Sequence, residues 1–175
     1  MRHLSFLLLS IFILFFASCK RSNVPSTKEN KSKKTKEHSK GNIHESNDKA
    51  SKVIKTARSY TGTPYKFGGT SRAGLDCSCL MLLCYKEVCI NLPRTSSEQS
   101  KMGTALKYSD LKPGDLVFFT DKKGGSKVVH AGLVSKVNGL RDVKFIHSST
   151  KLGVVESDLY VSYYENILIK ARRVL

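Results

Sequence analysis

The sequence is poor in acidic residues, with 14 Asp and Glu against 30 Lys and Arg, which gives a net charge of +16 at pH 7. A balance this basic first raises the question of a nucleic-acid partner. The chain has no long run of Lys and Arg and no nucleic-acid-binding motif, and its basic residues are spread along its length. We therefore expect no nucleic-acid partner, although attraction to an anionic polymer or membrane surface is consistent with the charge.

The chain is also too short for two ordinary domains. Its 175 residues allow one, and the 40% hydrophobic and 25% charged residues are typical of a globular protein. There is no internal repeat, and no SH3-like or sugar-binding module accompanies the domain. We expect a monomer with a single functional domain.

No apolar run is long enough for a permanent transmembrane helix. The run Leu4–Phe16 follows Arg2 and is shorter than the roughly 20 apolar residues that span a bilayer. Its length and flanks are those of a signal peptide, and the small residues before Cys19 resemble a bacterial lipobox. That resemblance implies cleavage after residue 18 and lipidation of Cys19, although Phe16 departs from the usual Leu. An ordinary secreted protein and an uncleaved anchor are the alternatives.

These signals predict three segments and a location. Residues 1–18 form a signal peptide, and residues 19–48, which are almost devoid of apolar side chains, form a flexible basic linker. Residues 49–175 form the domain. The lipid on Cys19 would hold the protein in the cell envelope, on a periplasmic or outer-membrane face.

Within the domain, helices precede strands. Apolar residues at helical spacing predict a first helix over 49–59, and a second apolar run follows Cys77. A short helix capped by Thr95 or Ser96 is expected over 95–102. The β-rich runs come afterwards, at 115–120, 128–136, 143–148 and 167–174. This order predicts an α+β fold in which the leading helices pack on an antiparallel sheet.

The predicted domain offers few groups for nucleophilic catalysis, namely four cysteines and two histidines. Cys77 follows a glycine-containing loop and begins a helix, where the helix dipole and free N–H groups favour the thiolate. Cys84 and Cys89 lie deeper in the apolar run and are expected in the core. His130 and His147 lie near the ends of neighbouring predicted strands. A helix-borne thiol facing two such histidines fits a papain-type arrangement.

Five motifs follow one another along the chain. They are a loop motif at residues 63–69, a nucleophile motif at 75–78, the segment after the catalytic helix at 92–99, a strand-entry motif at 111–119 and, as the fifth, the pair of histidine motifs in their expected order. Together they make the sequence over residues 50–175 resemble the NlpC-type cysteine peptidases of bacterial cell walls.

The resemblance implies a papain-like fold and a role for each matching residue. Cys77 would be the nucleophile, His130 the general base and later acid, and His147 the residue that orients His130. Tyr65 would lie at the edge of the site, near the oxyanion. The remaining residues implied near the substrate are Asp76, Ser78 and Arg94, although for Arg94 a structural role is an equal alternative.

The same resemblance implies a cell-wall hydrolase without metal or organic cofactor. It would cut peptidoglycan stem or cross-link peptides at D-glutamyl–diaminopimelate or D-alanyl–diaminopimelate bonds. Cys79 departs from the family pattern, which has Gly directly after the Asp-Cys-Ser motif. Cys is the next smallest apolar choice, so we expect activity to survive.

Three alternatives stay open. The four cysteines in residues 77–89 raise the question of a metal site, but they lack the paired C-x-x-C spacing of zinc modules. A catalytically silent wall-binding lipoprotein would share the fold, although the complete Cys–His–His set argues against it. A papain-like acyltransferase would share both the fold and the site.

Overall fold

The computed structural model describes residues 37–175, with side chains described from His44 onward, and these residues lie within one compact unit. The chain begins with helix α1 (Glu37–Ser59). Its end agrees with the expected helix, but its start lies well before the expected Lys49. The pairs His44–Asp48 and Glu45–Lys49 stabilise this part of the helix at i, i+4 spacing. The prediction of a flexible linker is therefore wrong over residues 37–48.

Two further helices carry the motifs that follow the first loops. Helix α2 (Cys77–Lys86) begins at Cys77, as the sequence predicts, and Asp76 is its N-cap. Helix α3 (Ser96–Gln99) is a single turn capped by Thr95, whose side chain accepts a hydrogen bond from the Glu98 N–H. The predicted cap is therefore confirmed, although the helix ends earlier than expected.

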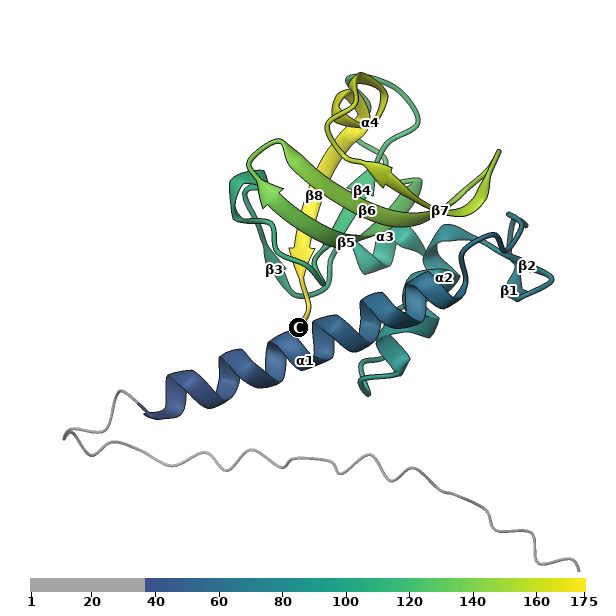
Figure 1. Cartoon of the computed structure of the whole chain (residues 1–175). Coiled ribbons are helices and arrows are strands. Elements are labelled where there is room, and N and C mark those ends of the chain that lie inside the picture. Colours follow the sequence, from purple (N-terminus) through teal and green to yellow (C-terminus); the bar gives the residue numbers. More distant parts are fainter. Residues whose placement is uncertain (1–36) are drawn as a thin grey trace, which may run out of the picture. The chain divides into compact units, whose positions relative to one another are not determined.

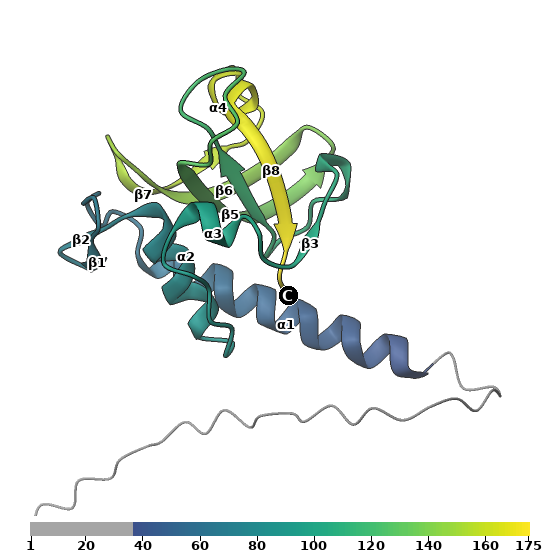
Figure 2. The ribbon, with the colours of Figure 1, turned by 180° about the vertical axis from the view of Figure 1, so that it is seen from behind.

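The rest of the chain forms an antiparallel sheet, shown in Figure 1, with strand order β3-β8-β4-β5-β6-β7. The bounds are β3 (Thr104–Ala105), β4 (Leu116–Phe119), β5 (His130–Gly139), β6 (Asp142–Ser149), β7 (Gly153–Asp158) and β8 (Leu168–Arg173). Four of these strands lie where the sequence predicts them. The α+β class is confirmed, with α1 and α2 packed on one side of the sheet (Figures 1 and 2).

Strand alternation divides the core between the two faces of the sheet. Leu116 and Phe118 of β4 pack in the cluster that also contains the buried residues of α1 and α2. Val117 and Phe119 point to the opposite face and pack in a second cluster with Phe145. Both faces are thus covered, and β4 is buried along its whole length.

Several elements after α1 are not predicted by the sequence pattern. The small ones are β1 (Thr70–Ser71), β2 (Gly74–Leu75), β3 and a 3₁₀ turn η1 (Tyr108–Asp110). The larger ones are the edge strand β7 and helix α4 (Ser162–Ile167), both of which reach the candidate site.

In the part of the chain from residue 37 onward, no helix is both long and apolar enough to cross a membrane. The predicted signal peptide and Cys19 lie outside the described residues.

Candidate active site

The Cys77 thiol lies at the junction of helix α2 and strand β5. Cys77 is the first residue of α2 and is 7% exposed. Burial raises the pKa of its thiol and the nearby charge of Asp76 adds to this, whereas backbone N–H groups of Ala131, Ser78 and Cys77 itself lower it. The net shift is upward, so the expectation that the helix start favours the thiolate is not met in the resting site.

The two histidines meet side by side at the ends of their strands. His130 begins β5 and His147 lies on the neighbouring strand β6. His130 Nε2 lies 2.9 Å from His147 Nδ1, and the two rings are perpendicular at 89°. Ala131, whose N–H contacts the thiol, directly follows His130. The structure thus brings His130 and His147 into direct contact and places the Cys77 thiol against the backbone of the residue that follows His130.

The far nitrogen of His147 is held by two residues that the sequence analysis did not find. His147 Nε2 lies 3.1 Å from Ser157 Oγ on β7 and 3.2 Å from the Tyr164 hydroxyl on α4. Both partners come from elements that had not been predicted. No motif in the sequence marks them, because the Ser157 contact depends on the pairing of β6 with β7 and the Tyr164 contact depends on where α4 packs.

Both imidazoles are neutral at pH 7. Burial lowers the pKa of His130 to about 4. Burial also lowers the pKa of His147, to about 3, and the neighbouring His130 adds to the shift. The two rings contact each other, so protonating one ring disfavours protonating the other.

A glycine and an aromatic cluster set the position of these rings. Phe145 stacks on His147, with ring centroids 4.7 Å apart, and Tyr164 contacts both rings edge-on. Gly132, on the strand of His130, makes room for this cluster, because a Cβ there would lie 2.5 Å from Phe145 Cδ2. Any other residue at position 132 would displace the ring on which His147 packs.

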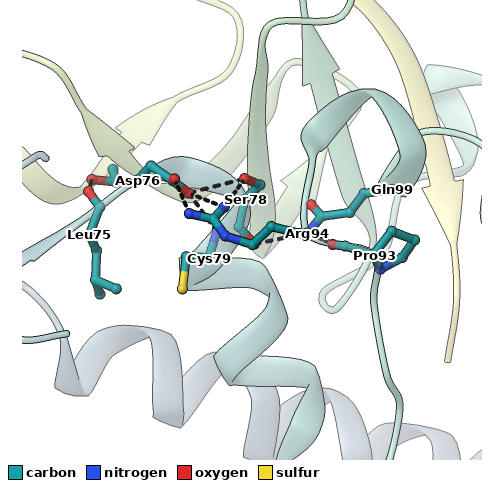
Figure 3. A network of polar contacts seen from close by, with 8 residues as sticks. Leu75, Asp76, Ser78, Cys79, Pro93, Arg94 and Gln99 are labelled. Atoms are coloured by element: carbon teal, nitrogen blue, oxygen red, sulfur yellow. Dashed lines mark hydrogen bonds and ion pairs between the residues drawn. The ribbon is translucent and has the colours of Figure 1, made fainter. Parts of the chain in front are cut away.

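A polar network fixes the start of α2, as Figure 3 shows. Asp76 accepts hydrogen bonds from the Cys79 N–H, the Ser78 hydroxyl and the Arg94 guanidinium. Although burial opposes ionisation, these bonds lower the pKa of Asp76. Gln99 ties the network to the loop by donating to the carbonyl oxygens of Ser78 and Pro93, at 2.9 Å each.

The network places the predicted substrate-binding residues Asp76, Ser78 and Arg94 together, and each has partners within the protein. Arg94 therefore has a structural role at the start of α2. Cys79 is 3% exposed, belongs to the core between the helices and the sheet, and its sulfur points away from the network (Figure 3). The departure from Gly is thus accommodated by packing.

A cavity of about 560 Å³ opens beside the histidines. His130, His147 and Tyr65 line it on one side, and residues of the β4–β5 and β6–β7 loops and of α4 complete it. Burial raises the pKa of the Tyr65 phenol, and Cys77 and Asp76 raise it further, so the hydroxyl remains a proton donor. Tyr65 therefore lies at the edge of the site, as the resemblance implies.

The other cysteines differ from one another. Cys84 is buried, and burial raises its thiol pKa to about 12, as expected for a core residue. Cys89 was expected in the core but is exposed, because α2 ends at Lys86 and the chain turns there with Cys89 at φ 61°. Within residues 37–175, no three His, Cys, Asp or Glu side chains are grouped so that they could hold a metal ion.

Comparison with known proteins shows which family the chain belongs to. Residues 62–173 match the model of the NlpC/P60 family. The chain is 38% identical over 119 residues to a probable endopeptidase NlpC of Escherichia coli, covering 67% of this chain and 73% of the relative. It is 33% identical over 129 residues to an Escherichia coli protein named murein DD-endopeptidase and murein LD-carboxypeptidase, covering 73% of this chain and 64% of that protein.

A solved structure extends the likeness to three dimensions. The crystal structure of an NlpC/P60 family protein from Bacillus cereus superposes with a TM-score of 0.66 at 33% identity, over 72% of this chain and 40% of that one. The fold is therefore that of a papain-like cysteine peptidase. The chain belongs to the NlpC/P60 family.

Proposed function

We propose that this protein is a cell-wall hydrolase that cuts amide bonds in peptidoglycan peptides, with Cys77 as the nucleophile. The single observation that carries the proposal is the paired histidines, 2.9 Å apart, beside a buried thiol at a helix start. The substrate class comes from the family resemblance and from the murein peptidase to which the chain is similar. The bond is D-glutamyl–diaminopimelate or D-alanyl–diaminopimelate.

The hydrogen bond between the histidines favours one tautomer for catalysis. His130 is a base toward Cys77 only if its Nδ1 is unprotonated. Its Nε2 then carries the proton and donates a hydrogen bond to His147 Nδ1. His147 then carries its own proton on Nε2, and this N–H donates a hydrogen bond to the hydroxyl of Ser157 or Tyr164. His147 acts as a positioning residue that holds the base in the productive tautomer.

In the first half of the reaction, His130 Nδ1 takes the proton of the Cys77 thiol as Sγ attacks the substrate carbonyl carbon. The C–S bond forms and the carbonyl oxygen gains negative charge. N–H groups at the start of α2, together with the Tyr65 hydroxyl, are the donors available to this oxyanion. The C–N bond then breaks, and the leaving amine takes the proton from His130.

In the second half, water releases the acyl group. His130 accepts a proton from the water as its oxygen attacks the thioester carbon, and the C–S bond breaks to return the proton to Cys77. The balance of atoms is one water consumed per amide bond cut. No oxidant, reductant or metal enters these steps.

Location is part of the same proposal. Cleavage after residue 18 and lipidation of Cys19 would attach a monomeric enzyme to a membrane face of the envelope. The excess of basic residues would favour the approach to anionic envelope polymers. The helical stretch Glu37–Ser59 would lie between the attached end and the catalytic loops.

The test is mass spectrometry of peptidoglycan fragments incubated with the full chain and with Cys77→Ala. We expect the wild type to release products whose mass increases by one water per cut, and Cys77→Ala to release none while melting as the wild type does. Cys79→Ala is the matched control and should remain active. Products joined to a second amine instead of water would identify a transferase, and an inert wild type would leave wall binding as the function.

A further inference from the structure

The cavity beside the histidines carries two opposite charges that the reaction above does not use. Asp121, in the loop after β4, and Lys151, in the turn between β6 and β7, both line it. Among residues 44–175, neither side chain takes part in an ion pair. The Asp121 carboxylate accepts one hydrogen bond, from the Thr120 hydroxyl at 3.1 Å. Both charges are therefore available to a ligand in the cavity.

The position of the cavity shows which half of a substrate it would hold. Both histidines line the cavity. Among the residues that the structure describes, those at the start of α2 (Asp76, Cys77 and Ser78) do not line it. The leaving amine takes its proton from His130, so that amine must lie on the histidine side of the thiol. The residue that carries the amine then extends into this cavity.

We propose that the cavity is the subsite for the leaving residue and that it selects a diamino dicarboxylic acid. Lys151 binds the free carboxylate of that residue, and Asp121 binds its free ammonium. Beyond a cut D-glutamyl bond in an uncross-linked stem tetrapeptide, the side chain of diaminopimelate carries both groups. Lysine in the same place carries only the ammonium, because its α-carboxyl lies in the next amide bond. This inference rests on the proposed function and adds the specificity of the same site.

The two charges make separable predictions, because each meets a different group of the substrate. Lys151→Gln removes the partner of the carboxylate, so it should affect diaminopimelate peptides and spare lysine peptides. Asp121→Asn removes the partner of the ammonium and should affect both peptides alike. Both side chains are exposed to solvent, so each loss should be a modest increase in KM of about three- to tenfold, with kcat little changed.

The experiment compares two stem tetrapeptides that differ only in their third residue, diaminopimelate or lysine, with the full chain purified in detergent. We expect the wild type to prefer the diaminopimelate peptide, and Lys151→Gln to lose that preference through KM. Lys136→Gln removes the same charge from an exposed strand position outside the cavity, and it should behave as the wild type.

The outcomes separate the inference from the function on which it rests. If the wild type cuts both peptides with equal kcat/KM and Lys151→Gln changes neither, the subsite is wrong although the hydrolase stands. The subsite is also wrong if Lys136→Gln has the effect expected of Lys151→Gln, since net charge alone would then explain the preference. If the wild type cuts no peptidoglycan peptide, the proposed function itself fails.

Discussion

Ser157 and Tyr164 should be partly redundant, because both contact the same nitrogen of His147. With either oxygen removed, His147 Nε2 keeps a partner at 3.1 or 3.2 Å. With both removed, the Nε2–H of His147 has no hydrogen-bond partner in the protein, and the His147 side chain is only 2% exposed. An unpaired buried donor costs about 1–3 kcal/mol. If that cost falls on the productive tautomer of His130, it corresponds to about a 5- to 150-fold loss in rate. Each single variant should lose less than about fivefold.

The assay is kcat/KM on a stem peptide for Ser157→Ala, Tyr164→Phe and the double variant, with thermal unfolding as a check of the fold. Tyr164→Phe keeps the ring that packs on Phe119 and Phe145. Tyr160→Phe, which removes a hydroxyl elsewhere, serves as the control. Nitrogen NMR of the His147 ring would show the tautomer directly. A folded double variant with wild-type kcat/KM would refute the positioning role, and so would single losses as large as that of the double variant.

Four further predictions test other parts of the site. Because burial lowers the pKa of His130 to about 4, this base stays unprotonated above that pH, and kcat/KM should fall on the acid side near pH 4. A fall near the ordinary pKa of 6.5 would contradict the effect of burial. His130→Ala should lower kcat/KM by about 100- to 10,000-fold. His147→Asn should retain more activity than either His147→Ala or His130→Ala. A folded His147→Asn variant as inactive as His130→Ala would give His147 a further role. Arg94→Gln should lower the free energy of unfolding in urea by about 1–2 kcal/mol, because Asp76 stays buried and charged without its main partner. Arg58→Gln breaks the more exposed pair with Glu156, and a smaller loss for Arg94→Gln than for Arg58→Gln would refute this. Cys19→Ala should abolish labelling by radioactive palmitate and release the protein from membranes, and an unlabelled wild type would exclude lipidation.

The sequence predicted best those features that depend on local pattern. The β-rich run at 115–120, the apolar run after Cys77 and the cap at Thr95 each follow from neighbouring residues, and the structure contains all three. The pairing of β5 with β6, which brings His130 to His147, follows from two strands joined by a short turn. These elements were sufficient to predict the antiparallel sheet and the two histidines side by side.

Features that depend on distant contacts were missed. Strand β7 gains its place from pairing with β6, and its Ser157 reaches His147 only through that pairing. Helix α1 extends to Glu37 although its early residues are polar, so composition predicted a linker there. The raised pKa of Cys77 has the same origin, since burial depends on the whole fold and outweighs the local effect of the helix start.

The buried, neutral thiol has a consequence for the lifetime of the protein in an oxidising compartment. Peroxides and disulfides react with thiolates, and a cysteine with a raised pKa and little exposure holds few of them at neutral pH. Cys77 should therefore resist sulfenic acid formation and mixed disulfides while the site is empty. The thiolate would form only when a peptide is bound and the proton of the Cys77 thiol passes to His130. Chemical durability and catalytic readiness would then depend on the same burial.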